Sequence, residues 1–213
     1  AVCNEKVLET YLEGGSIGEE DIRQMIQKRE LFPCFFGSAL KMEGIEELLF
    51  ALSEYTKMPE YQEKFGATVF KITRDAQGSR LTHLKVTGGV LKARNLLTGH
   101  KQNKPEDIWE EKVNQIRIYS GEKYETKDEV EAGTICAVTG LSYTYPGEGL
   151  GIQTESELPI LEPVLTYELI LPEGVQPQAM MPKLTMLEEE EPELHIVWEE
   201  EKKEIHAQIM GEI

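Results

Sequence analysis

Short segments of alternating apolar and polar residues, separated by turn signals, fill the middle of this chain of 213 residues. Alternation with a period of two is typical of strands that bury one face against a core. Asp75-Ala76-Gln77-Gly78 and Gly88-Gly89 interrupt the alternation and predict turns. Strands are expected near 68–72, 81–86, 90–98, 112–119 and 134–140. Several short strands at this spacing predict a small closed β-barrel.

Two helices are predicted at the start of the chain. Residues 4–13 place apolar side chains at helical spacing, and Asn4 is a residue type that caps helix starts. Ser16 to Glu19 has the Ser-x-x-Glu pattern of a capping box. A second helix, with apolar residues from Ile22 to Ile26, is therefore expected directly after it.

A short apolar run and a third helix follow. Residues 31–36 combine aromatic and aliphatic side chains and stop at Gly37, which predicts a buried strand. Residues 44–55 carry apolar side chains on one helical face, and 59–64 has the composition of a linker. The order helix, strand, helix fits the edge of a parallel α/β sheet.

The last part of the chain mixes the two periodicities. Strands are predicted at 163–171, 194–198 and 203–209, and a helix is predicted at 175–188. Strand, helix, strand, strand is the order that opens a ferredoxin-like α/β sandwich. The acidic run from Glu188 to Glu191 ends this helix, and we expect it to be solvated rather than to bind a metal.

Charge is unevenly distributed along the chain. The formal net charge is -17, and residues 65–157 hold 13 acidic and 12 basic residues, which gives this segment a net charge of -1. Residues 158–213 hold 13 acidic and 3 basic residues. Only the middle segment is therefore expected to contact a phosphate backbone. Three scattered cysteines, Cys3, Cys34 and Cys136, are typical of a protein in the reducing cytoplasm.

One turn carries the first resemblance to a known family. Phe35-Phe36-Gly37-Ser38-Ala39-Leu40-Lys41 resembles the fifth nucleotide motif of GTPases. In that family the backbone N–H groups of the turn meet the guanine O6 atom. A small residue lets the backbone approach the base, and an N–H donor favours a carbonyl acceptor.

Further stretches, in the same order along the chain, resemble elongation factor G. The family usually has Gly-Asp-Thr-Leu at the end of its barrel, whereas this chain has Gly147-Glu148-Gly149-Leu150. Two stretches look closer to the tetracycline-resistance ribosomal protection branch: Tyr143 to Gly151 and Leu194-His195-Ile196-Val197-Trp198. The matching stretches are 31–55, 68–95, 130–141, Glu189-Glu190-Glu191-Pro192 and Met210-Gly211-Glu212.

The resemblance implies an internal fragment of a translational GTPase, with an α+β multidomain fold. Residues 1–62 would be the C-terminal part of a P-loop GTPase α/β domain, 63–157 the translation-factor β-barrel, and 158–213 the start of a ferredoxin-like domain. The intact parent would bind GTP and Mg²⁺, and its partners would be the ribosome, small-subunit rRNA and ribosomal protein, with no DNA and no membrane. Ser38, Ala39 and Leu40 would contact guanine in that parent.

The phosphate-contacting residues are predicted from charge and location only. Arg80, Lys85, Lys92 and Arg94 lie on the predicted barrel and are our candidates for rRNA contacts. The alternative interpretation is that these four residues are solvated cations on the barrel surface without an RNA partner, and the sequence favours neither interpretation. Two other functions stay open: an ordinary elongation factor G, and a stand-alone β-barrel interaction module without GTPase activity.

No residue pattern in the chain predicts catalysis. The sequence has no Gly-x-x-x-x-Gly-Lys-Ser/Thr loop, and its histidines (His83, His100, His195 and His206) lack a metal-ligand spacing. Asn103-Lys104-Pro105-Glu106 and Asp75-Ala76-Gln77-Gly78 mimic GTPase motifs but follow Ser38, the reverse of the family order. We interpret both as turns.

These absences give a direct prediction for the chain of 213 residues. It should neither hydrolyse GTP nor bind it tightly, because the groups that hold the phosphates and Mg²⁺ are missing. Isothermal titration calorimetry with GTP checks this, and saturable binding with a 1:1 endpoint would contradict it.

Overall fold

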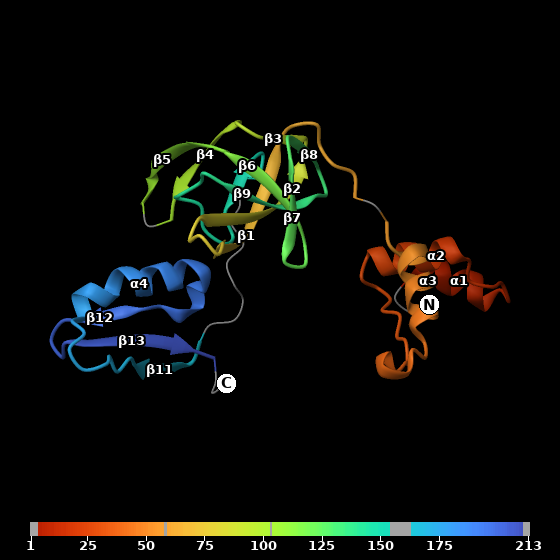
Figure 1. Cartoon of the computed structure of the whole chain (residues 1–213). Coiled ribbons are helices and arrows are strands. Elements are labelled where there is room, and N and C mark those ends of the chain that lie inside the picture. The colour runs from red at the N-terminus through yellow and green to blue at the C-terminus, as the bar shows by residue number, and fades with distance from the viewer. Residues whose placement is uncertain (1–3, 58, 103, 154–162, 211–213) are drawn as a thin grey trace. The chain divides into compact units, whose positions relative to one another are not determined.

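The chain divides into two compact units, residues 1–60 and residues 61–213. The computed structural model describes residues 4–57, 59–102, 104–153 and 163–210, and Figure 1 shows its helices and strands. No helix among these residues is long and apolar enough to cross a bilayer. The predicted boundary between residues 157 and 158, and Gly211-Glu212 of the proposed family marker, lie outside the described residues.

The first unit is helical, as the sequence predicts. Asn4 caps α1, because its side-chain oxygen accepts a hydrogen bond from the Val7 backbone N–H at 3.3 Å. The predicted capping box at Ser16 is wrong: α2 starts from Gly18, which makes no side-chain cap bond. The helices of this unit are α1 (Glu5–Leu12), α2 (Glu19–Gln27) and α3 (Ile45–Tyr55), with a 3-10 turn, η1, at Ala39–Lys41.

The strand predicted at 31–36 is absent. These residues form no strand in the described chain, and the Phe32 and Phe36 side chains are 74% and 94% exposed. Among the described residues, the pairing nearby is a bridge between Ser38 and Glu43. An apolar run signals a tendency to be buried, but a strand also needs a neighbour for its backbone hydrogen bonds. None of the described residues offers that neighbour.

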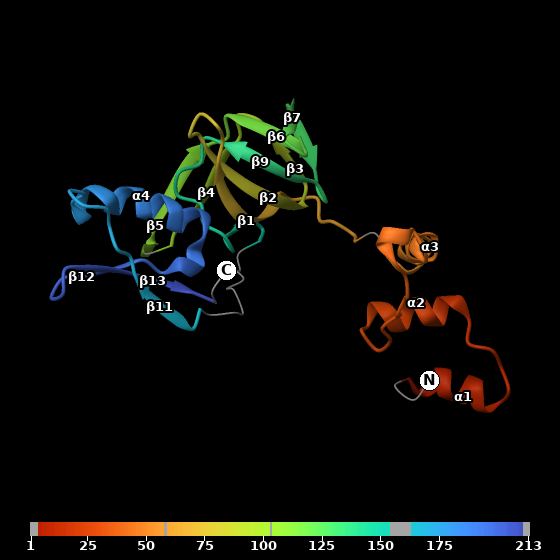
Figure 2. The same cartoon turned by 60° about the horizontal axis from the view of Figure 1, so that its bottom comes forward.

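The second unit begins with a β-domain, which we define as residues 61–153. Its main sheet is antiparallel, with the order β10-β1-β2-β9-β6-β7, and the remaining strands form the pairs β3-β8 and β4-β5. Figure 2 shows β6, β9 and β2 lying side by side. The strands are β1 (Gly66–Arg74), β2 (Arg80–Gly88), β3 (Val90–Lys92), β4 (Leu96–Lys101), β5 (Lys104–Lys112), β6 (Gln115–Ser120), β7 (Lys123–Lys127), β8 (Glu129–Glu131), β9 (Ile135–Thr139) and β10 (Gly149–Gly151).

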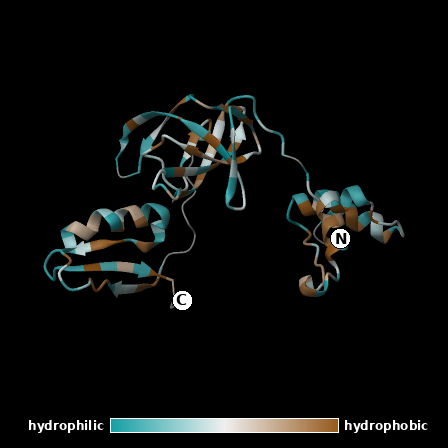
Figure 3. Cartoon of the chain, in the orientation of Figure 1, coloured by the Kyte–Doolittle hydropathy of each residue, from teal (hydrophilic) through white to brown (hydrophobic). Residues whose placement is uncertain are grey.

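The predicted closed barrel needs correction. The hydrogen-bonded sheets of the described residues do not close into a ring, because β4 and β5 pair with each other instead of joining the main sheet. The strands still enclose one hydrophobic core, and Figure 3 shows hydrophobic and hydrophilic residues interleaved along them. The largest fully buried apolar side chains of this core are Ile72, Leu84, Leu91, Ile116, Leu141 and Leu150.

The turn that mimics a GTPase motif is structural. The Asp75 carboxylate accepts hydrogen bonds from the backbone N–H groups of Gln77 and Ser79, at 3.1 and 2.8 Å. The Ser79 N–H, followed by the Arg117 guanidinium, lowers the pKa of Asp75. Of the second decoy, Asn103 lies outside the described residues, and Lys104 begins β5 rather than a turn.

The C-terminal part of the second unit has the predicted order of strand, helix, strand and strand. It consists of β11 (Leu165–Glu168), α4 (Pro177–Glu190), the 3-10 turn η2 (Pro192–Leu194), β12 (Val197–Glu199) and β13 (Glu204–Ile209). The sheet order is β11-β13-β12, with both pairs antiparallel. Ile205 and Ala207 are its buried strand residues.

The acidic run at the end of α4 forms ion pairs while it remains partly exposed. Glu189 accepts hydrogen bonds from Arg74 at 2.6 Å and from Arg80 at 3.3 Å. Glu188 accepts a hydrogen bond from the Ile196 backbone N–H at 2.8 Å. The run thus stays partly exposed, as the sequence analysis expects, and it also pairs with cations of β1 and β2 that the sequence did not identify.

Glu148 is a buried carboxylic acid that joins three parts of the β-domain. Its side chain accepts hydrogen bonds from Trp109 Nε1 at 3.1 Å and from the Tyr145 backbone N–H at 3.4 Å. Its backbone carbonyl accepts a hydrogen bond from the Val69 N–H at 2.9 Å. Gly99 is needed beside it, since a Cβ there would overlap both Glu148 Oε1 and the Trp109 ring.

Burial raises the pKa of Glu148 to about 7. The folded chain therefore holds this proton more tightly than the unfolded chain, whose glutamate titrates near pH 4.5. Stability should fall as the pH rises between these two values, by roughly 3 kcal/mol from this group. Glu148→Gln should remove that part of the pH dependence, as measured by urea unfolding at pH 5 and pH 8.

Glu110→Gln provides the matched control, since Glu110 is an exposed neighbour of Trp109. We expect it to keep the pH dependence of the parent chain. Equal pH dependence in Glu148→Gln and the parent chain would contradict the prediction.

Candidate nucleic-acid interface

The turn at Ser38 has backbone donors suited to a carbonyl acceptor. Ser38 precedes η1, and its own N–H group donates to the Glu43 carbonyl at 3.0 Å. Ala39 and Leu40 open the 3-10 turn, where backbone N–H groups lack partners inside the turn. Gly44, with φ of +74°, follows the turn. Glycine is needed there because a Cβ would lie 2.5 Å from the Phe36 carbonyl oxygen. Guanine contact by Ser38, Ala39 and Leu40 stays a prediction.

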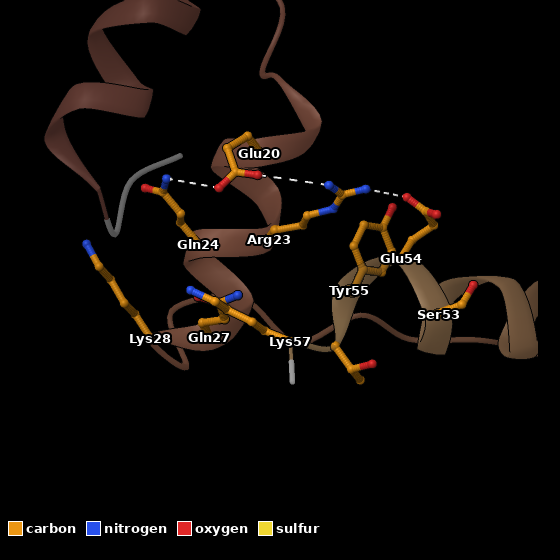
Figure 4. Close-up of a pocket in the computed structure, with 10 residues that line it drawn as sticks. Glu20, Arg23, Gln24, Gln27, Lys28, Ser53, Glu54, Tyr55 and Lys57 are labelled. Carbon is orange, nitrogen blue, oxygen red and sulfur yellow. Dashed lines mark hydrogen bonds and ion pairs between the residues drawn. The ribbon is translucent and has the colours of Figure 1, made fainter. Parts of the chain in front are cut away.

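A polar hollow in the first unit does not resemble a nucleotide site. It lies between α2 and the end of α3, and Figure 4 shows its side chains. Arg23 pairs with Glu54 and lies 3.9 Å from Glu20, and Gln24 donates to Glu20 at 3.3 Å. Glu20, Arg23 and Glu54 of this hollow thus pair with one another.

Arg80, one of the four predicted RNA contacts, forms most of its hydrogen bonds within the protein. Its side chain is 14% exposed and donates to the carbonyls of Leu141 and Thr144 and to the hydroxyls of Thr82 and Thr144. It also donates to Glu189. This guanidinium holds the loop after β9 onto β2. Its role as an RNA contact stays a prediction, and its geometry argues against it.

The other three predicted contacts lie on the surface of the β-domain. Lys85 is exposed on β2, and Arg94 is exposed in the turn between β3 and β4, with φ of +70°. Lys92 is 59% exposed on β3, and its Nζ atom lies 2.9 Å from the Glu129 carboxylate of β8. Lys85 and Arg94 are therefore more available to a phosphate than Lys92.

Four aromatic rings that the sequence analysis missed lie in a row across the outer face of the main sheet. We call Phe70, His83, Tyr119 and Tyr124 the aromatic row; they come from β1, β2, β6 and β7. Successive ring centroids are 6.1, 6.2 and 5.3 Å apart. The Phe70, Tyr119 and Tyr124 side chains are 49%, 36% and 47% exposed. Only the pairing of the strands reveals the row, because its members are far apart in sequence.

The register explains how the aromatic row forms. The pairing shifts between Val69 and Lys71, so that Phe70 is an extra residue and both Phe70 and Lys71 are exposed. Ala137 of β9 lies opposite His83 on one side and Arg117 on the other. Its small side chain lets the rings of β2 and β6 meet above β9.

Two polar interactions fix the chemistry of the row. The Thr73 hydroxyl lies 2.7 Å from His83 Nε2, and burial, followed by the Lys71 charge, lowers the pKa of His83. The imidazole is therefore neutral near pH 7. Arg117 stacks on the Tyr124 ring, with its guanidinium carbon 4.5 Å from the centroid, while its Nη1 atom binds Asp75 at 3.0 Å.

Comparison with known proteins gives a consistent similarity over the whole chain. The chain is 30% identical to elongation factor G from Ureaplasma parvum serovar 3, and 29% identical to elongation factor G from Ureaplasma urealyticum serovar 10. Both alignments run over 243 residues and cover 100% of the chain and 34% of the relative, so the chain spans about a third of their length. These similarities support the elongation factor G family.

A solved structure shares the fold. A crystal structure of a protein from Thermus thermophilus superposes with a TM-score of 0.74 at 23% identity, and the match covers 98% of this chain and 33% of that chain. No protein-family model matches the chain. The predicted α+β fold class is confirmed, and the chain matches one part of a longer protein.

The contrast between Arg80 and Lys85 can be measured as stability. Arg80→Ala should lower the free energy of unfolding by about 1–3 kcal/mol, because it leaves buried carbonyls of the loop after β9 without a hydrogen-bond donor. Lys85→Ala should change it by less than about 0.5 kcal/mol, since Lys85 is exposed. Urea unfolding followed by tryptophan fluorescence checks both, and equal effects of the two substitutions would contradict the structural role of Arg80.

Proposed function

We propose that the chain is a segment of a ribosome-binding translational GTPase of the elongation factor G family. The observation that carries this proposal is a similarity that spans the whole chain and about a third of elongation factor G. In the proposed parent, GTP and Mg²⁺ would bind to the nucleotide domain, and Ser38, Ala39 and Leu40 would meet the guanine base. We also propose that the chain comprises three domains or parts of domains, with boundaries between residues 62 and 63 and between residues 157 and 158.

The β-domain is the part that we propose contacts small-subunit rRNA. Its support is chemical: the segment 65–157 is close to neutral, whereas residues 158–213 carry strong negative charge. Lys85 and Arg94 are exposed cations in this domain. Ribosomal protein is the partner that we propose for surfaces of the chain that lack such cations.

The branch within the family is a finer proposal. The sequences at 143–151 and 194–198 favour the tetracycline-resistance ribosomal protection branch, whereas the named relatives are elongation factors G. Ribosome binding by the full-length parent that releases tetracycline would support the protection branch. Binding that leaves tetracycline in place would favour an ordinary translocation factor.

A stand-alone β-barrel module is the alternative from another class. It leaves residues 1–60 without a role, although these residues take part in the similarity to elongation factor G. The coding sequence upstream of Ala1 separates the two functions. A phosphate loop in frame would support the GTPase parent, and a start codon directly before Ala1 without such motifs would favour the module.

Ribosome contact by the β-domain can be tested with the chain itself. We expect it to co-sediment with small ribosomal subunits at low salt, and Lys85→Ala or Arg94→Ala to weaken that association. Each lost phosphate contact should reduce the slope of log affinity against log salt by about 0.7–0.9. Co-sedimentation over a salt series measures this slope.

Lys92→Ala is the matched control, because Lys92 already pairs with Glu129. We expect it to have the smallest effect of the three lysine and arginine substitutions. The proposal fails if the parent chain does not bind small subunits, or if all three variants bind as the parent chain does.

A further inference from the structure

The outer face of the main sheet combines aromatic rings with positive charge. Lys71 is directly opposite His83 in the register, and Lys85 follows two residues later on the same face. Arg117 lies on that face too, because it is opposite Ala137, which is opposite His83. Lysine and arginine beside exposed rings are the groups that bind a phosphate backbone and its bases together.

The rings of the aromatic row are accessible to a ligand. Phe70 and Tyr124 occupy the two ends of the row and are about half exposed. Arg117 covers one face of the Tyr124 ring. An arginine and an aromatic ring stack readily on each other. A base that stacks on Tyr124 would thus extend the stack that Arg117 and Tyr124 already form.

The spacing of the rings favours bases that are not stacked on each other. Successive centroids are 5.3 to 6.2 Å apart, and the ring planes are tilted by 41° to 51°. Bases in a duplex strand rise by about 3.4 Å. Neighbouring rings therefore cannot each stack on consecutive bases of a duplex, whereas a single strand with separated bases can follow the row.

We propose that the aromatic row is a stacking platform for unpaired RNA bases, with Phe70 and Tyr124 as its principal stacking residues. Lys71 and Lys85 are exposed beside the rings and would bind the strand's phosphates. Arg117 supports the Tyr124 ring instead, because its side chain is 10% exposed and pairs with Asp75. The neutral His83 ring joins the two ends of the platform without repelling the cations beside it. The choice of RNA rests on the proposed ribosomal function, whereas the preference for unpaired bases rests on the ring geometry.

Binding of two RNA probes to the full chain tests the platform. The probes are a labelled oligouridylate and the duplex that it forms with oligoadenylate, and fluorescence anisotropy at low salt measures both affinities. We expect the single strand to bind more tightly than the duplex. Phe70→Ala and Tyr124→Ala should each weaken single-strand binding by about 5- to 100-fold, the range for loss of one base–aromatic stack.

Two further variants separate stacking from other effects. Tyr124→Trp should keep single-strand binding, because indole also stacks on bases. Tyr143→Ala removes another half-exposed ring of the β-domain that is not in the row, and should leave binding unchanged. Far-ultraviolet circular dichroism of every variant verifies that its fold is retained.

The outcomes distinguish this proposal from the proposed function. Equal affinity for single strand and duplex, with Tyr124→Ala binding as the parent chain does, overturns the stacking platform. If Lys85→Ala still weakens association with small subunits in that case, the rRNA contact survives as a phosphate contact. If the parent chain binds neither the RNA probes nor small subunits, both proposals fail.

Discussion

The pairing of β2 with β1 on one side and β9 on the other is the interaction on which the β-domain depends. Side chains alternate between the two faces of a strand, so a shift of one residue would exchange the core with the outer surface. In the observed register Leu84 is fully buried, while its neighbour Lys85 is exposed. The bulge at Phe70 adjusts β1 to this register and presents Phe70 and Lys71 together. The same pairing therefore forms both the hydrophobic core and the candidate RNA surface.

A partly buried arginine and a buried glutamate anchor the loop between β9 and β10. Arg80 binds the loop at Leu141 and Thr144, and Glu148 binds Trp109 near its other end. Such groups cost free energy when they are removed from water, and their hydrogen bonds offset that cost only in one geometry. They consequently select one path for this loop. Glu148 occupies the segment where the sequence departs from Gly-Asp-Thr-Leu, so that departure comes with a buried carboxylic acid and its glycine neighbour, Gly99.

Much of the fold was predictable from local patterns, but its long-range pairing was not. Alternation and helical spacing identified the helices and the strands β1, β2, β6 and β9, since periodicity is a local property. They did not identify β5, although it is nine residues long. Strands of three residues, such as β3, β8 and β10, are too short to show a period, and β4–β5 pairing depends on contacts that no local pattern encodes. Arg80 and Lys85 are both basic residues on one predicted strand, and only the packed loop beside Arg80 separates their roles. The aromatic row was missed for the same reason.

The distribution of charge limits how the chain can bind RNA. The segment 65–157 has a net charge of -1 and the segment 158–213 a net charge of -10, so long-range attraction to a polyanion is weak. Affinity must then come from short-range contacts with a few phosphates and bases. The available exposed cations, chiefly Lys85 and Arg94, can release only a small number of counterions, which makes the salt dependence shallow. Stacking on Phe70 and Tyr124 is less sensitive to salt than phosphate contacts are. A surface of this kind is therefore suited to recognising unpaired bases within an RNA that other parts of a larger protein have already brought close.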